Sequence, residues 1–317
     1  MKSAMKLGLD SFSFQIALAG GSYDLFRTLD TMEAMGLSGL QININGPNGR
    51  FLGGAPSDAS HVRRVRRTLA RKGFFVEIGG MSTRPEMLDW QLRLCDEIGA
   101  DVFRTLLVFQ GSLDATFEQA RRDIEQSLPL ARALGVRIAL ENHEDVTAAE
   151  LRRFLDLIRD PYLGACLDTG NDLVVYGDPL ESASLLAPCA LTTHIKDQKL
   201  VRHNGAVHSV GVPLGTGDVV LPDILAIIRR QSPLGRLLIQ DTIGYSSPLN
   251  PFKRADLAPR QSYAAVPEFT SVEVGYEGGL LLSLDHLTPG QLQAHAEEKA
   301  KAIARDVAYV RNLLKIA

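Results

Sequence analysis

Four short runs of strand-forming residues each end at a side chain that can bind a metal ion or carry a proton. In chain order, these residues are Glu141, Asp168, His194 and Gln240. Two carboxylates, one imidazole and one amide oxygen suit Mn²⁺, Mg²⁺ or Co²⁺, and they differ from the thiolate sets of structural zinc sites. Any one of them alone would be read as a strand-end cap or half of a salt bridge. Four at successive strand ends predict a site for one divalent metal ion, with Mn²⁺ as the first choice.

The elements that must position these residues alternate between strands and helices along the whole chain. Expected strands cover residues 7–11, 39–45, 74–78, 102–108, 136–141, 163–168, 190–197 and 236–241. Helical spacing and end signals place a helix after each strand, with capping boxes at Thr147–Glu150 and Thr288–Gln291. Eight such units predict an α/β protein whose parallel sheet closes into a (β/α)₈ TIM barrel, a single domain over residues 1–317. A Gly-x-Gly-x-x-Gly turn follows none of the strands, which disfavours a doubly wound dinucleotide-binding sheet.

Composition excludes several classes of function. Of the 317 residues, 45% are hydrophobic, which permits a sizeable core, and a net charge of −3 with scattered basic residues gives no footprint for nucleic acid or an anionic membrane. No apolar run reaches the roughly 18 residues of a transmembrane span, and no signal-peptide region precedes the first strand. We therefore expect a cytoplasmic protein. Cys95, Cys166 and Cys189 lack metal-type spacing and are expected to be free thiols.

Two long segments interrupt the alternation of strands and helices. Residues 198–220 separate the strand of His194 from its helix, and residues 241–287 separate the strand of Gln240 from the last helix. The carboxyl ends of barrel strands converge on one face, so both segments emerge beside the predicted metal ligands. Loops of this length are usually lids, binding loops or subunit contacts. We expect the excursion 241–287 to cover the mouth of the barrel, or to contact a second copy of the chain or another partner subunit.

Four motifs resemble those of the xylose-isomerase-like TIM barrels, a superfamily of sugar isomerases and epimerases, inosose dehydratases and related lyases. They are Leu140–His143, Leu167–Asn171, Thr193–Asp197 and Pro213–Gly217. The resemblance spans nearly the whole chain and is weakest in the first hundred residues and in the excursion 241–287. It implies that Glu141, Asp168 and His194 are metal ligands, with a fourth ligand at the end of strand eight. It also implies a small-molecule sugar or keto-sugar as the substrate.

The end of strand eight departs from that resemblance. Epimerases of this group usually have glutamate there, whereas this chain has Gln240 followed by Asp241. Two glutamates on opposite faces of an enediolate pass a proton both ways, and glutamine cannot carry one. Either Asp241 takes that role, or the second acid/base lies elsewhere, with His143 and Lys196 the nearest candidates. Abstraction of a proton beside a metal-bound ketone, followed by loss of a β-substituent, needs no second glutamate. The departure therefore shifts weight from epimerisation toward elimination.

These observations predict a divalent-metal-dependent isomerase or epimerase that acts on a ketose or cyclitol through an enediolate. The metal would act as a Lewis acid. The first alternative is a dehydratase or lyase, of the inosose type or cleaving a 3-keto-glycoside by β-elimination in the manner of a C-glycoside deglycosidase. The second is a non-catalytic sugar-binding barrel.

Specific side chains follow from this reading. The predicted catalytic residues are Glu141, His143, Lys196 and Gln240. The predicted substrate-binding residues are Arg104, Asn171, Asp241 and His208. Arg104 is expected to face the barrel interior near the end of strand four, where a guanidinium could also serve as an ion-pair partner.

Overall fold

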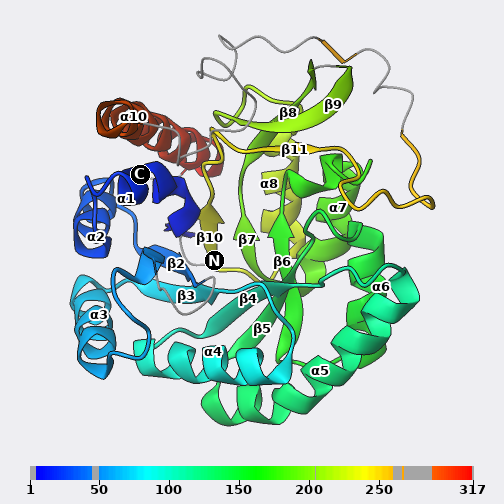
Figure 1. Cartoon of the computed structure of the whole chain (residues 1–317), viewed down its shortest axis with the longest axis horizontal. Helices are drawn as coiled ribbons and strands as arrows, with labels where there is room; N and C mark the ends of the chain where they lie inside the picture. Colours follow the sequence, from blue (N-terminus) through cyan, green and yellow to red (C-terminus); the bar gives the residue numbers. More distant parts are fainter. Residues whose placement is uncertain (1–4, 45–49, 204, 260–265, 268–287, 316–317) are drawn as a thin grey trace.

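The computed structural model describes residues 5–44, 50–203, 205–259, 266–267 and 288–315 (Figure 1). Eight parallel strands form one sheet in the order β10-β1-β2-β3-β4-β5-β6-β7. Their bounds are β1 Lys6–Asp10, β2 Gly39–Asn43, β3 Phe75–Gly79, β4 Val102–Leu106, β5 Arg137–Glu141, β6 Leu163–Asp168, β7 Ala190–His194 and β10 Arg236–Ile239. The predicted TIM barrel is confirmed.

The barrel closes between β7 and β10. Ile195, directly after β7, pairs with Ile239, and its N–H donates to Leu238 O at 2.8 Å. In return, Ile195 O accepts from Gln240 N at 2.9 Å. The Thr193 hydroxyl accepts from Leu238 N at 3.1 Å. A side chain thus adds a hydrogen bond between β7 and β10, where the two strands share few backbone hydrogen bonds.

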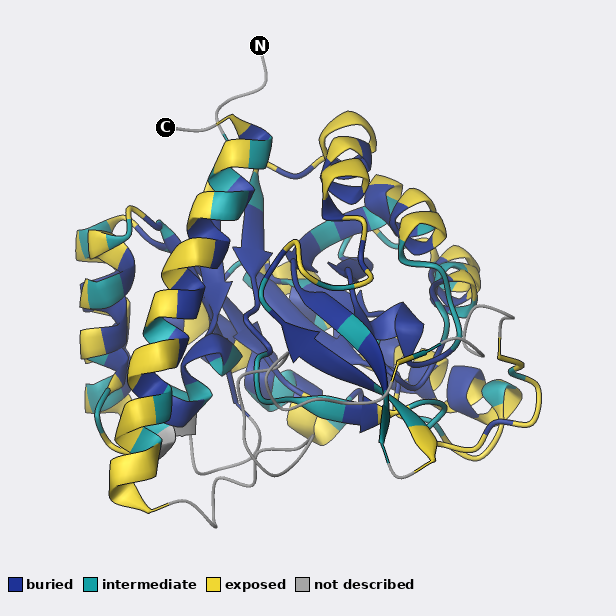
Figure 2. Cartoon of the chain, turned by 90° about the horizontal axis from the view of Figure 1, so that it is seen from above, coloured by how far each residue is buried: buried dark blue, intermediate teal, exposed yellow. Residues whose placement is uncertain are grey.

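Helices surround the barrel, with buried faces toward the strands and exposed faces outward (Figure 2). They are α1 Gln15–Ala19, α2 Leu25–Ala34, α3 Ala59–Lys72, α4 Pro85–Ile98, α5 Leu113–Leu134, α6 Ala148–Ile158, α7 Pro179–Leu186, α8 Leu221–Gln231 and α10 Pro289–Leu314. Both predicted capping boxes, at Thr147 and Thr288, are present. Helix α4 ends at Gly99 with φ 89°, a left-handed conformation that glycine adopts without steric cost. No helix within the described ranges is both long and apolar enough to cross a membrane.

Part of the segment 198–220, predicted as an irregular loop, is a β-hairpin. Strands β8 Asp197–His203 and β9 Ala206–Val212 pair antiparallel, and β11 Ser246–Pro248 extends this second sheet along β9. Valines 201, 210 and 212 bury one face of the hairpin in a small cluster of their own. The expectation of a loop over this part was wrong, because the two strands pair with each other and these valines supply a buried face.

Asp197 anchors the turn that follows this hairpin. Its carboxylate accepts the backbone N–H groups of Gly215, Gly217 and Val219 at 2.8, 3.0 and 3.2 Å. A Cβ at Gly217 would lie 2.2 Å from Asp197 Oδ1, so only glycine permits this approach. The turn thereby holds the start of α8 beside the base of the hairpin.

Residues 241–259 begin the predicted excursion 241–287, and most of its remainder lies outside the described residues. The described part is tied to the loop between β5 and α6. Tyr245 Oη and Ser247 Oγ each donate to Glu144 at 2.7 Å, and Arg254 donates to Glu150 at 2.5 and 2.8 Å. We call residues 242–254 the strap. Since Tyr245 lines the cavity described below, the strap lies at the mouth of the barrel.

Candidate active site at the barrel mouth

A cavity of about 250 Å³ opens at the carboxyl ends of the barrel strands. Its polar lining comprises Asn43, Arg104, Glu141, His143, Asn171, Lys196, Gln240 and Thr242. Its remaining wall comprises Phe12, Phe51, Met81, Leu106 and Tyr245. The cavity is smaller than typical drug-binding pockets and combines an apolar wall with convergent polar groups, as small-ligand sites do. Six of the predicted site residues therefore meet in one place.

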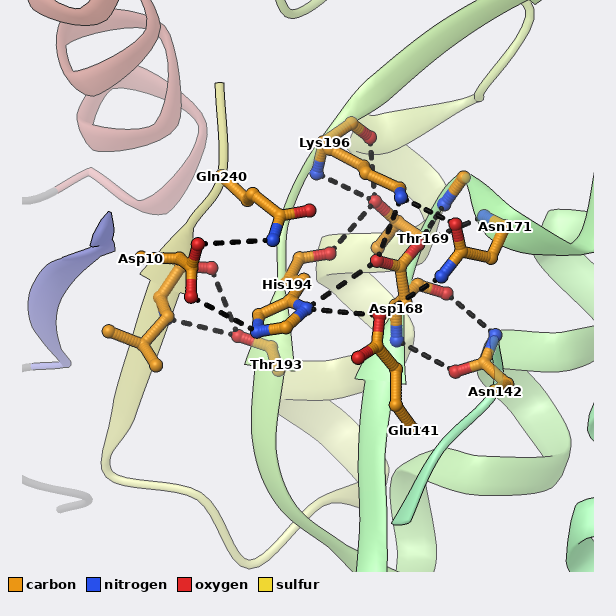
Figure 3. A network of polar contacts seen from close by, with 12 residues as sticks. Asp10, Glu141, Asn142, Asp168, Thr169, Asn171, Thr193, His194, Lys196 and Gln240 are labelled. Carbon is orange, nitrogen blue, oxygen red and sulfur yellow. Dashed lines mark hydrogen bonds and ion pairs between the residues drawn. The ribbon is translucent and has the colours of Figure 1, made fainter. Parts of the chain in front are cut away.

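His194 lies buried beneath this cavity (Figure 3). Its Nδ1 is 3.3 Å from Glu141 Oε1 and 3.6 Å from Asp168 Oδ2. Its Nε2 faces the other way, 2.9 Å from Gln41 Oε1 and 3.8 Å from Asp10 Oδ2. The ring thus presents one nitrogen to the two predicted carboxylate ligands, while Gln41 and Asp10 hold the other.

Asp168 has one oxygen fully engaged and one that is not. Oδ1 accepts the N–H groups of Gly170 and Asn171 at 2.8 and 2.9 Å. Oδ2 is buried without a hydrogen-bond partner among the described residues, although Lys196 Nζ forms an ion pair with it at 3.1 Å. Lys196 supplies a compensating positive charge at Oδ2 but lacks the geometry of a hydrogen bond, so this oxygen is less well satisfied than Oδ1.

Asn142 fixes the separation between the ends of β5 and β6. Its amide donates to Asp168 O at 2.9 Å and accepts from Asp168 N at 2.8 Å. Asp172 accepts from the same amide at 2.5 Å and, through its other oxygen, from Ala148 N at the start of α6. Burial raises the pKa of Asp172 to about 7. Sequence reasoning missed this clamp, although Asn142 directly follows Glu141 in one of the family-like motifs.

Charges around Glu141 favour its ionised form. Burial opposes ionisation, but the positive charges of His194 and Arg104 outweigh it and hold the pKa of Glu141 well below its usual range. Arg104 Nε is 3.4 Å from Glu141 Oε2. Burial likewise opposes the charged form of His194, yet neighbouring Cys166 and Glu141 raise its pKa well above the ordinary value. The cluster therefore attracts positive charge to the space between its acidic groups.

The donor set fits the implied divalent ion. Glu141, Cys166 and His194 offer ligand atoms that all lie within 4.8 Å of one another. Burial raises the pKa of the Cys166 thiol to about 11, and alternation along β6 places it one step deeper than Asp168. The oxygen and nitrogen donors of Glu141, Asp168 and His194 are therefore the better set. Asp168 Oδ2 has an ion pair with Lys196 but no hydrogen-bond donor among the described residues, and a bound cation would explain this.

His143 lies at the cavity beside a carboxylate that orients it. Its Nδ1 is 2.9 Å from Asp145 Oδ2, and Asp145 Oδ1 accepts Phe109 N–H at 3.1 Å. Burial opposes the charged imidazole, but the hydrogen bond with Asp145 and the charges of Glu141 and Glu144 outweigh it, so the pKa of His143 is raised. This geometry makes His143 a candidate acid.

Lys196 is held on the same side of the cavity as Asp168. Its Nζ donates to Asn171 Oδ1 at 2.5 Å, and Asn171 Nδ2 donates to Glu141 Oε1 at 3.0 Å. The backbone of Lys196 exchanges two hydrogen bonds with the Thr169 hydroxyl, at 2.6 and 2.9 Å. The ammonium group therefore faces a ligand in the cavity from a fixed position.

Two predicted substrate-binding residues lie elsewhere. Asp241 accepts Ile243 N–H at 2.9 Å and pairs with Lys299 of α10 at 3.2 Å, away from the cavity lining. His208 lies on β9 with its ring centroid 6.5 Å from that of His203, and it does not line the cavity. Side chains alternate in direction along an extended chain, and Gln240 faces the cavity. The next side chain, Asp241, therefore points away from it.

Asp10, at the end of β1, is a site residue that sequence reasoning missed. It is fully buried and accepts from Gln240 Nε2 at 3.2 Å and from Asn43 Nδ2 at 2.8 and 2.9 Å. A signal was present, because Asp10 is the residue before the last in the first expected strand, 7–11, whereas the observed β1 ends at Asp10 itself. Tyr245 and Gln41 were missed as well, and neither follows the strand-end pattern.

A family model described as the xylose isomerase-like TIM barrel matches residues 29–239. The chain belongs to this family. It is 26% identical over 160 residues to the 3-oxo-isoapionate decarboxylase of Pectobacterium atrosepticum, a match that covers 50% of this chain and 58% of that protein. The chain thus spans little more than half the length of this curated relative.

Solved structures share the fold over almost the full chain. The IOLI protein with a bound zinc atom has a TM-score of 0.64 at 12% identity, covering 98% of both chains. The D-psicose 3-epimerase of Clostridium cellulolyticum H10, solved with D-tagatose, has a TM-score of 0.63 at 11% identity, covering 98% of this chain and 99% of the other. Likeness at these identities shows the barrel itself.

Proposed function

We propose that this family member is a divalent-metal-dependent isomerase or epimerase that forms an enediolate from a ketose or cyclitol. The observation that carries the proposal is the convergence of Glu141, Asp168 and His194 beneath the cavity, where Asp168 Oδ2 has no hydrogen-bond donor among the described residues. Similar structures named as sugar epimerases and as a zinc-containing protein support it.

Four residues would hold the ion, and they are Glu141, Asp168, His194 and Gln240. Mn²⁺ is our first choice, with Mg²⁺ and Co²⁺ as alternatives, because the donors are oxygen and imidazole nitrogen. When bound, the ion would supply Lewis-acid stabilisation of the oxygens of the enediolate.

The polar and apolar walls of the cavity would orient the substrate. Arg104, Asn43 and Asn171 present donors and acceptors for hydroxyl groups. Arg104 is fixed for this role by hydrogen bonds to Gly80 O at 2.9 Å and to Asn43 Oδ1. The apolar wall around Phe12 would cover the carbon face of a sugar and exclude water from it.

Proton transfer would start at Glu141, whose lowered pKa keeps it ionised as a base. It would take the proton from the carbon next to the carbonyl. The return proton would come from His143, which Asp145 orients, or from Lys196 Nζ on the Asp168 side of the cavity. Gln240 cannot take part in this transfer, because its amide neither gains nor loses a proton near neutral pH.

Solvent deuterium exchange tests the proposal. Protein loaded with Mn²⁺ should incorporate deuterium next to the carbonyl of at least one member of a panel of ketoses and cyclitols. The Asp168→Ala variant should incorporate none above background. Binding of a sugar without exchange across the panel would instead support a non-catalytic sugar-binding barrel.

A lyase or dehydratase is the second candidate, and Gln240 favours it. A single base at Glu141 and a single acid at His143 suffice for abstraction followed by loss of a β-substituent. The curated relative is named a decarboxylase, and loss of CO₂ from a 3-oxo acid likewise leaves an enolate that one acid protonates. Detection of an unsaturated ketone, or of CO₂, among the products would decide for this class and against the isomerase.

A further inference from the structure

The buried carboxylate of Asp10 collects donors from three directions. Oδ1 accepts Phe12 N–H at 2.8 Å, and both oxygens lie within 2.9 Å of Asn43 Nδ2. Gln240 Nε2 lies 3.2 Å from Oδ1 across the pair formed by β1 and β10, and His194 Nε2 lies 3.8 Å from Oδ2. Asp10 does not line the cavity itself, so it acts on a ligand only through these neighbours.

This contact determines which way the Gln240 amide points. An ionised carboxylate only accepts hydrogen bonds, so the amide nitrogen must face Asp10 and the amide oxygen must face away. In Figure 3 that oxygen points away from Asp10, and Gln240 lines the cavity. Asp10 therefore fixes the orientation of the Gln240 amide oxygen, and this oxygen presents an uncharged ligand atom to the cavity.

The same contact excludes a carboxylate at position 240. A glutamate in the place of Gln240 would bring an acidic oxygen to about the present 3.2 Å separation from Asp10 Oδ1. Two carboxylates at that distance cannot both be ionised without a large penalty. His194 Nε2 is 2.9 Å from Gln41 Oε1 and 3.8 Å from Asp10 Oδ2, so positive charge on its ring offsets that penalty only in part.

We infer that Asp10 is a positioning residue that excludes a carboxylate from position 240 and turns the Gln240 amide oxygen toward the cavity. The exclusion holds whether or not the proposed function is right, whereas the use of that oxygen as a metal ligand rests on the proposed function. With Asp10 in place, the ligand set has two carboxylates, from Glu141 and Asp168, in place of three. An ion held by fewer negative charges stays a stronger Lewis acid.

A double-mutant cycle on chelator-treated protein tests the exclusion without metal or substrate. The four proteins are the wild type, Gln240→Glu, Asp10→Asn and the double variant, each unfolded with urea. We expect Gln240→Glu to lower the folding equilibrium constant by about tenfold or more beside Asp10, and by much less beside asparagine. An equal loss in both backgrounds would overturn the inference. If Asp10→Asn does not fold, Asp10→Ser replaces it, because serine keeps an oxygen for Phe12 N–H.

Gln240→Met supplies the matched control. It removes the hydrogen bond with Asp10 and adds no charge. The decrease that it causes in the folding equilibrium constant should therefore be nearly the same with and without Asp10→Asn. Coupling as strong in the methionine cycle as in the glutamate cycle would assign the effect to packing and overturn the inference.

Mn²⁺ affinity, measured by titration calorimetry, tests the orientation of the amide. Asp10→Asn should weaken binding by about tenfold, because outer partners of metal ligands contribute on that scale. Unchanged affinity in a folded Asp10→Asn variant would show that Asp10 does not orient the Gln240 amide. The exclusion of a carboxylate would still be decided by the unfolding cycle.

Discussion

The barrel holds two charge clusters, a partly exposed one toward the amino ends of its strands and a buried one at the mouth. In the first, Arg236 donates to Glu77 at 2.9 Å and to Asp101 at 2.6 and 3.1 Å. The second oxygen of Glu77 accepts from Gln41 at 3.1 Å. At the mouth, by contrast, Asp168 keeps one oxygen without a hydrogen-bond partner among the described residues.

The difference separates a cluster that supports the fold from one prepared for a ligand. A satisfied network gains nothing further from a bound cation, whereas an incompletely satisfied carboxylate does. Gln41 joins the two clusters, because its Oε1 accepts from Arg104 at 3.2 Å and lies 2.9 Å from His194 Nε2. Disrupting the first cluster should lower stability, and disrupting the second should lower metal binding.

The largest effect should come from Asp168→Ala. We expect the wild type to hold about one Mn²⁺-class ion per chain, and the variant to lose it together with roughly 10³-fold of any activity. Its stability without metal should fall, because the N–H groups of Gly170 and Asn171 and the buried Lys196 ammonium lose their acceptor. Elemental analysis and urea unfolding measure both quantities.

Asp156→Ala, which removes an exposed carboxylate on α6, is the control and should keep the metal. Wild-type stoichiometry in Asp168→Ala would show that the ligand set is wrong.

The next effect concerns the cluster toward the amino ends. Glu77→Ala leaves Arg236 Nε and Gln41 Nε2 without an acceptor, and we expect a loss of about 3 kcal/mol in the free energy of unfolding. Mn²⁺ affinity should stay within about twofold of the wild type, because no predicted ligand contacts Glu77 directly. Loss of metal in parallel with stability would contradict the separation of the two clusters.

The dependence of stability on pH sharpens the same contrast. Burial outweighs the charge of Arg236 and raises the pKa of Glu77. The protonated side chain therefore contributes stability that is complete below the ordinary glutamate pKa and is lost as pH rises through the raised value. Glu77→Gln has no titrating carboxyl at this position. Between the ordinary and the raised pKa of Glu77, the free energy of unfolding of the wild type should therefore fall by up to about 1.4 kcal/mol per pH unit relative to that of the variant. Parallel curves for the two proteins would refute this.

The smallest effect should come from Tyr245→Phe at the strap. Loss of its hydrogen bond to Glu144 should cost about 1 kcal/mol of stability and raise KM severalfold, because the ring also lines the cavity. Ser247→Ala removes the other hydrogen bond to Glu144 without touching the cavity, and it should change stability alone. Equal effects of both variants on KM would mean that the strap acts only as a support.

Sequence patterns predicted the barrel because each strand–helix unit carries its own local signals. They also predicted that Glu141 and His194 would meet, since parallel strand ends converge. Sequence patterns could not predict the hydrogen bond between Gln240 and Asp10. It depends on the pairing of β1 with β10 and on the rotamers of both side chains. Asp241 was misplaced for a related reason. One step along a strand reverses the face, and the acidic residue is the one that turns outward to Lys299.

The pairing of the first barrel strand, β1, with the last, β10, also bears on how the protein folds. The hydrogen bond between Gln240 and Asp10 joins residues 230 positions apart, and β1 pairs with β10 beside it. Contacts of such sequence separation form slowly, because the chain between them must first be confined. The site at the mouth is therefore completed only when the first and last strands meet. Uptake of metal during refolding should follow the kinetics of that closure and lag behind the burial of helix α4 and its neighbours.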